Sequence, residues 1–104
     1  MRNDDNKSEF YTFILGANEV RSMSFSGARQ VVICCDDVTR SGEYVLLSNQ
    51  PNVFKPNGDI DTEQYIYLPD RQGGQNPLIV ESNDDMLYFG ATGANMLVQI
   101  WVVR

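Results

Sequence analysis

Short apolar segments separated by turn-forming residues recur along the whole chain, and this pattern constrains the fold more than any other feature. No window of about eleven residues keeps apolar residues at the spacing of an amphipathic helix. The segments are rich in β-branched and aromatic residues and end at Gly, Asn, Asp, Pro or Ser, as β-strands do. The strands are expected at 10–15, 20–25, 30–35, 43–47, 64–68, 78–80, 86–89 and 96–103.

About eight short strands in 104 residues predict an all-β protein, a single β-sandwich of jelly-roll type with essentially no helix beyond a turn. The segments 86–89 and 96–103 are expected to pair across the turn GATGAN. The last segment, MLVQIWVV, is apolar on both faces apart from Gln99, which predicts a central strand covered on both sides, by the second sheet and by a neighbour or a partner chain. On this interpretation Trp101 lies in the core, and its removal costs about 3–5 kcal/mol.

The first nine residues, MRNDDNKSE, differ from the rest of the chain because they are almost entirely polar. We therefore divide the chain into a polar N-terminal arm, 1–9, and a sandwich domain, 10–104. A segment of this composition cannot build a core, so we expect it to become ordered against another surface. The charged residues expected to pair with a neighbouring subunit are Arg2, Asp4, Asp5, Lys7 and Glu9.

Charge and composition argue against several classes of function. The formal net charge is −6 and the eight basic residues are scattered singly, so no nucleic-acid partner is expected. No apolar stretch approaches the roughly 20 residues of a membrane-spanning helix, and the start does not resemble a signal peptide. We therefore expect synthesis in a cytoplasm and no membrane partner.

The chain contains no histidine, which removes imidazole-activated nucleophiles and histidine-containing metal sites. Its two cysteines, Cys34 and Cys35, are adjacent in a predicted strand, so their side chains point to opposite faces and do not pair easily with each other. We interpret them as reduced, apolar packing residues. Neither an enzymatic activity nor a cofactor is expected.

The stretch KPNGDIDTEQ, 55–64, places oxygen donors at alternate positions: Asn57, Asp59, Asp61 and Glu63. Such donors could bind calcium, but Gly58 precedes Asp59, and this order does not match the EF-hand pattern. Alternate side chains of an extended segment also do not converge on one ion unless the segment curls. We favour a solvated polar loop and predict no metal site.

Other candidate sites have simpler interpretations. The acidic pairs Asp36–Asp37 and Asp84–Asp85 could form a carboxylate dyad, but adjacent aspartates after a strand more often form turns. Tyr65 and Tyr67 are expected on one face of a strand, either as sheet-surface packing or as a platform for a sugar or a protein partner. The glycines of GATGAN lack the lysine and the helix of a phosphate-binding loop.

The layout resembles small structural proteins of tailed-bacteriophage virions. The matching segments run from EVRSMSFSGARQVVI through EYVLLS, QYIYLPD and DMLYFGATGAN to MLVQIWVV, and they cover residues 19–104. The resemblance implies a β-sandwich that decorates or cements a capsid, with no catalytic residue. It also implies a place in the virion, the major capsid protein or other virion subunits as partners, and assembly as a homo-oligomer, a trimer or dimer.

A second class of function stays open at this point. A small sandwich of this kind could bind a carbohydrate or receptor, as a head or tail accessory protein, through Tyr65, Tyr67 and the acidic stretch. A glycan array probed with and without calcium separates the two classes.

Overall fold

The computed structural model describes residues 8–81 and 86–104. They form eight strands: β1 (Ser8–Leu15), β2 (Val20–Ser24), β3 (Gln30–Asp37), β4 (Val45–Ser48), β5 (Tyr65–Tyr67), β6 (Leu78–Glu81), β7 (Met86–Ala91) and β8 (Met96–Val103). Within the described ranges the helical structure is limited to the 3-10 turn η2 (Arg71–Gly73). The prediction of an all-β chain is confirmed.

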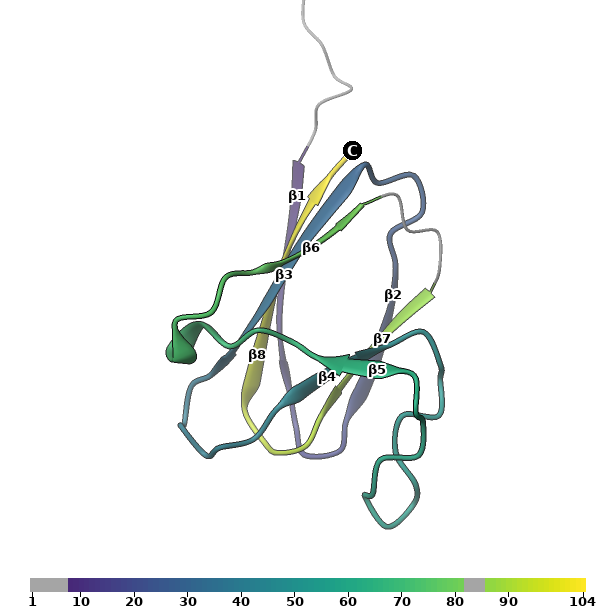
Figure 1. Cartoon of the computed structure of the whole chain (residues 1–104), viewed down its shortest axis with the longest axis vertical. Helices are drawn as coiled ribbons and strands as arrows, with labels where there is room; N and C mark the ends of the chain where they lie inside the picture. Colours follow the sequence, from purple (N-terminus) through teal and green to yellow (C-terminus); the bar gives the residue numbers. More distant parts are fainter. Residues whose placement is uncertain (1–7, 82–85) are drawn as a thin grey trace, which may run out of the picture.

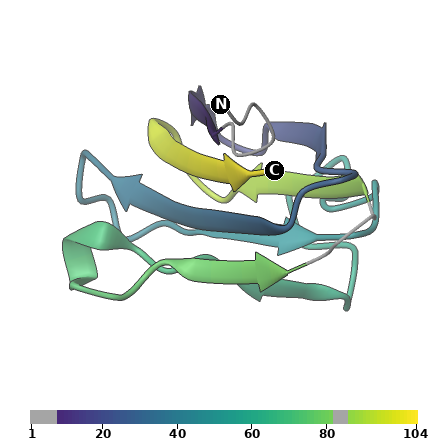
Figure 2. The same ribbon diagram turned by 90° about the horizontal axis from the view of Figure 1, so that it is seen from above.

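The strands form two four-stranded antiparallel sheets (Figure 1), which we call sheet A and sheet B. Sheet A has the order β1-β8-β3-β6, and sheet B has the order β2-β7-β4-β5. Figure 2 shows sheet A from above, with β1, β8, β3 and β6 following one another down the view. The first strand pairs with the last, the second with the seventh, the third with the sixth and the fourth with the fifth. This nested pairing is the arrangement of a jelly roll, as the strand pattern predicted.

The expected hairpin between 86–89 and 96–103 is wrong. β7 lies in sheet B between β2 and β4, whereas β8 lies in sheet A between β1 and β3. The GATGAN segment therefore crosses from one sheet to the other. An alternating pattern shows that two segments are strands, but it does not show whether a short connection stays within one sheet.

The core lies between the sheets and is built from alternate residues of each strand. On β8 the inward side chains Met96, Val98, Ile100 and Val102 are buried. Phe89 lies in the middle of the core, where its ring packs edge-on against Phe13, with ring centroids 5.7 Å apart. This period-two alternation is what a half-buried strand requires.

The core covers the inner face of β8, whereas its outer face is open in the single chain, and the cover expected there from a neighbour or a partner chain stays a prediction. Trp101 points away from the core and is 42% exposed. The cost of about 3–5 kcal/mol that we expected for its removal applies to buried aromatic residues such as Phe89 rather than to Trp101. β8 therefore has apolar side chains on both of its faces. Those on one face fill the core, and those on the other form part of the protein surface.

Candidate functional site

The outer face of sheet A carries a row of apolar side chains that crosses all four strands. The register places Trp101 of β8 opposite Phe10 of β1 on one side and opposite Val32 of β3 on the other. Val32 is in turn opposite Ile79 of the edge strand β6. We call Phe10, Trp101, Val32 and Ile79 the apolar row. Residues opposite one another in neighbouring strands lie on the same face, so the four side chains form one continuous band.

The apolar row is well exposed to solvent. Phe10 is 73% exposed and Ile79 is 56% exposed, although both are large apolar residues. The rings of Phe10 and Trp101 stack with centroids 5.9 Å apart and planes 12° from parallel. A second exposed isoleucine, Ile14, lies on the same face of β1. A continuous exposed apolar band of this kind makes the outer face of sheet A a candidate contact site.

A shallow pocket of about 460 Å³ lies next to the apolar row. Its lining includes Trp101, Val32 and Cys34 from the sheet, and Arg71 and Pro77 from the segment that connects β5 to β6. Arg71 donates a hydrogen bond from Nη1 to Gln99 Oε1 at 3.1 Å. Partial burial raises the pKa of the Cys34 thiol, so the thiol contributes an uncharged surface to the pocket.

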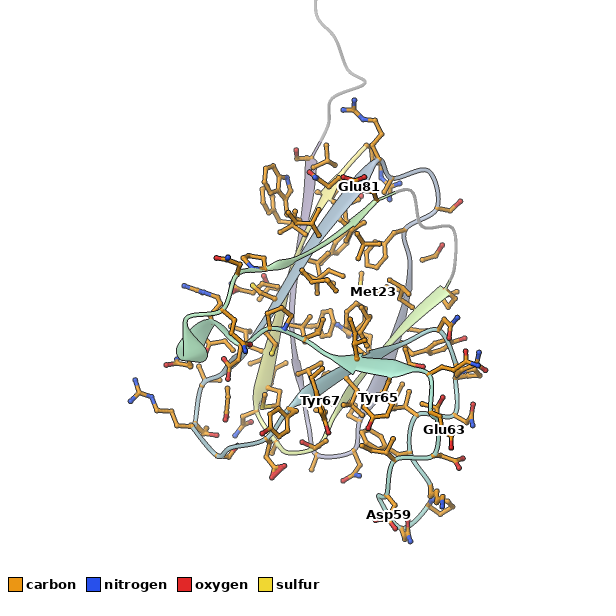
Figure 3. All side chains as sticks on the ribbon, viewed as in Figure 1. Met23, Asp59, Glu63, Tyr65, Tyr67 and Glu81 are labelled. Carbon is orange, nitrogen blue, oxygen red and sulfur yellow. The ribbon has the colours of Figure 1, made fainter. Side chains whose placement is uncertain are left out.

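The rows on either side of the apolar row carry little charge. One row contains Ser8, Val103, Gln30 and Glu81, and the other contains Thr12, Gln99 and Cys34. Among these described rows Glu81 is the single carboxylate, at the corner of the sheet on β6 (Figure 3). Further along β3, Asp36 accepts a hydrogen bond from Gln72 Nε2 at 2.8 Å. The outer face of sheet A is therefore nearly neutral in a chain of net charge −6.

The outer face of sheet B differs because the β4–β5 loop, 49–64, packs on it. Leu46 of β4 points outward, yet it is fully buried, as is Val53 of the loop. A Cβ atom on Gly90 of β7 would lie 2.8 Å from both Val53 Cγ1 and Phe54 Cε2, so loop and sheet are in close contact. The loop covers the middle of this face, around Leu46 and Gly90, while Val20, Met86 and Tyr67 toward its edges stay partly exposed, and the apolar row on sheet A is left open.

Tyr65 and Tyr67 lie on β5 (Figure 3), and the structure brings them together with Tyr44. The ring centroids of Tyr44 and Tyr67 are 4.7 Å apart, and those of Tyr65 and Tyr67 are 5.7 Å apart. We call these three residues the tyrosine cluster. A hydrogen bond with Tyr65 raises the pKa of the Tyr67 hydroxyl. The expectation that Tyr65 and Tyr67 share a face is confirmed, while their role in binding a partner stays a prediction.

The alternating polar stretch of the β4–β5 loop forms local hydrogen bonds. Asn57 Oδ1 accepts from the backbone N–H of Asp59 at 3.0 Å, and Asn57 Nδ2 donates to Asp59 Oδ2 at 3.2 Å. Asp61 Oδ2 accepts from Asn52 Nδ2 at 3.5 Å. Asp59 and Glu63 lie at separate places on the loop in Figure 3. Among the residues the structure describes, no three acidic, cysteine or histidine side chains are grouped as metal ligands would be.

Asp36 and Asp37 point to opposite sides of β3 and do not form a dyad. Asp37 Oδ1 accepts hydrogen bonds from the backbone N–H and the hydroxyl of Ser41, at 3.1 and 3.0 Å, and Oδ2 accepts from Gly42 N–H at 2.8 Å. Desolvation raises the pKa of Asp37, but these hydrogen bonds outweigh it and hold the pKa below its ordinary value. Asp37 thus closes a turn, whereas Asp84 and Asp85 lie outside the described residues.

Of the charged residues assigned to the N-terminal arm, Glu9 is described and lies in β1 opposite Val102. Its Oε1 is 3.0 Å from Arg104 Nε, and this hydrogen bond lowers the pKa of Glu9. The remaining four residues, Arg2, Asp4, Asp5 and Lys7, lie outside the described residues. The ion pair joins the first described strand to the end of the chain, next to the apolar row.

The apolar row was not singled out as a site from the sequence. Its members come from four separate segments, and their alignment depends on strand order and register. The available signal was the double-faced apolar pattern of MLVQIWVV, which indicated that something covers the second face of that strand.

Comparison of the chain with protein-family models, with curated proteins and with solved structures gave no significant match. The described residues also contain no helix that could cross a lipid bilayer. Function is therefore argued from the surface features above.

Proposed function

We propose that this protein is a non-enzymatic structural subunit of a tailed-bacteriophage virion, a decoration or cement protein that binds the capsid surface and stabilises the shell. The observation that carries the proposal is the exposed apolar row on the outer face of sheet A, which suits the chain to assembly with other protein subunits. A continuous exposed apolar band across four strands serves contact with protein better than it serves chemistry. The jelly-roll strand order and the resemblance of residues 19–104 to virion proteins support the same proposal.

A decoration protein stabilises a shell because many copies bind it, each through a modest contact. Each copy bridges neighbouring shell subunits and buries additional area at a joint, and the shell multiplies this modest contribution by avidity. The chain has the compact core that such a subunit needs. Because Ser8 and Glu9 belong to β1, the residues before that strand, 1–7, are the segment that we expect to reach the major capsid protein. The proposal requires no cofactor.

Quantitative mass spectrometry of purified virions tests the proposal. The reference is the major capsid protein of the phage whose genome encodes this chain. We expect on the order of hundreds of copies per particle, in a fixed ratio to capsid subunits. A handful of copies would place the protein at the tail or portal and contradict a decoration role. Absence from washed virions would overturn a virion role altogether.

The tyrosine cluster favours a second candidate, a carbohydrate- or receptor-binding module. Tyr44 and Tyr67 are about half exposed and form a ridge at the edge of sheet B. Aromatic faces of this kind pack against the apolar faces of sugar rings. A glycan array, probed with and without calcium, separates the candidates: specific binding that is lost in Tyr67→Ala would favour the second one, and an empty array would favour the decoration role.

A further inference from the structure

We infer that the apolar row is the interface of a homodimer, in which two copies of this chain pack the outer faces of sheet A against each other. The inference deepens the proposed function, on which it rests in taking the row as a contact surface, but it does not require a capsid. It assigns the row to a second copy and leaves capsid attachment to other surfaces.

The outer faces of the two sheets differ in how much of each the chain itself covers. On sheet B, the β4–β5 loop buries Leu46 completely and approaches Gly90 closely. On sheet A, Phe10, Trp101 and Ile79 stay exposed, although they occupy one continuous band. The chain therefore covers the middle of sheet B with its own loop, whereas the apolar row across sheet A is left for a partner to cover.

Charge favours a second copy over a partner of opposite charge. Each chain carries a formal charge of −6, so two copies repel one another over most of their surfaces. The apolar row and the rows beside it contain one carboxylate, Glu81, at a corner of the described sheet, and Asp36 further along β3 is buried and accepts a hydrogen bond from Gln72. A cationic partner would find little to bind on this face, whereas a like-charged copy meets the least repulsion there.

The size of the face is sufficient for a dimer of modest affinity. Three strands of eight residues and the four-residue β6, spaced about 4.8 Å apart, give a face of about 19 by 26 Å that shortens to about 13 Å at β6. Its projected area is about 440 Å², and protruding side chains raise the accessible area toward the roughly 800 Å² per partner of a standard interface. We therefore expect dissociation in the micromolar range.

A two-fold axis that relates the two copies is enough to bring their outer faces of sheet A together. Sheets pack face to face about 10 Å apart, and a two-fold interface joins the same surface of both copies. Trp101 and Val32 lie on the two central strands, β8 and β3, so they come closest to the axis. Phe10 and Ile79 lie on the edge strands and reach the periphery of the partner's face.

Trp101 is the single tryptophan of the chain, so the intrinsic tryptophan fluorescence reports on the environment of the apolar row. We expect its fluorescence emission to shift to shorter wavelength, and its quenching by acrylamide to weaken, as the full chain is concentrated from about 1 to about 500 µM. Sedimentation equilibrium over the same range should show a monomer–dimer transition. Added salt should strengthen the dimer, since it screens the repulsion between acidic copies.

Two matched substitutions locate the interface. Ile79 on β6 and Ile66 on β5 are exposed isoleucines on edge strands, 56% and 50% exposed. Ile79→Glu should weaken dimerisation at least tenfold, because it places two carboxylates in an apolar contact, whereas Ile66→Glu should dimerise like the unaltered chain. Circular dichroism checks folding, and Ile79→Ser serves where Ile79→Glu does not fold.

The inference is overturned if the unaltered chain stays monomeric with unchanged Trp101 emission over the whole range. It is also overturned if both isoleucine variants dimerise equally well, since the contact would then lie elsewhere. These outcomes are separate from the virion test: a monomer found in many copies on virions defeats the dimer alone, and a dimer absent from virions defeats the proposed function alone.

Discussion

At the scale of single residues, neighbours in a strand of this protein meet opposite environments. Cys34 lines the open pocket beside the apolar row, whereas Cys35 is buried in the core. The Cys35 thiol donates a hydrogen bond to the carbonyl oxygen of Pro69, with Sγ 3.4 Å from that oxygen. Burial, with smaller contributions from Asp70 and Cys34, raises the pKa of Cys35 to about 12 from the ordinary value of 9.0.

This difference predicts a loss of stability at alkaline pH. The unfolded chain releases the Cys35 proton near pH 9.0, whereas the folded protein keeps it until about 12, so the free energy of unfolding falls as the pH rises through that window. The contribution of one group cannot exceed about 1.4 kcal/mol per pH unit. Urea unfolding measured between these pH values should show a shallower decline for Cys35→Ala than for the unaltered chain. Cys34→Ala is the control, since that thiol is only partly buried; equal slopes for both variants would contradict the assignment.

At the scale of elements, the β4–β5 loop completes sheet B by packing on it. Val53 and Phe54 approach Gly90 so closely that a Cβ atom at that position would meet both. The same loop is held locally, because Lys55 N–H donates to Asp59 O at 2.7 Å and Asp61 N–H donates to Val53 O at 2.8 Å. A loop that covers a sheet and bonds to itself is a part of the fold rather than a free ligand-binding segment.

Gly90→Ala should therefore destabilise the protein. The added methyl group forces the loop off the sheet or shifts the side chains of Val53 and Phe54, at a cost of about 1–3 kcal/mol. Thermal or urea unfolding measures this loss. Gly73→Ala is the matched control, because the nearest atom to its added Cβ is the side-chain Cγ of Gln75, at 4.0 Å. A Gly90→Ala protein as stable as the control would show that the loop does not need this contact.

The polar stretch of the loop should not link folding to a metal ion. Asn57 and Asp59 bond to each other, and Asp61 bonds to Asn52. Because a bound ion stabilises the folded state, removing it would lower the melting temperature. We expect EDTA to leave the melting temperature unchanged. A fall of several degrees with EDTA that calcium restores would instead identify the loop as a calcium site.

At the scale of the whole molecule, a loop covers the middle of one outer face of the jelly roll while the other outer face carries the open apolar row, and the first described strand is tied to the last. β1 pairs with β8 along its full length, and Glu9 forms an ion pair with Arg104. The sandwich is therefore complete from Ser8 onward. If residues before this strand serve attachment, they can be removed without loss of the domain.

Deletion of residues 2–7 tests that expectation. The melting temperature of the isolated protein should be nearly unchanged, because β1 keeps all of its pairing with β8. Binding to virions stripped of this protein should weaken, since the arm's charges are expected to pair with a shell subunit. A large fall in melting temperature would show that the arm belongs to the domain, and undiminished binding would show that attachment lies on the sandwich.

The sequence by itself determined the fold class and most strand positions, because alternation of apolar and polar residues is a local property that the chain carries into any sheet. It also determined that Cys34 and Cys35 face opposite ways and that Tyr65 and Tyr67 face the same way. Only the tertiary structure decided that β7 and β8 lie in different sheets, and that the outer face of β8 is open while that of β4 is covered. Strand order, register and loop packing arise from contacts between residues far apart in the chain, so the alignment of Phe10, Trp101, Val32 and Ile79 in one row exists only after the sheets have formed.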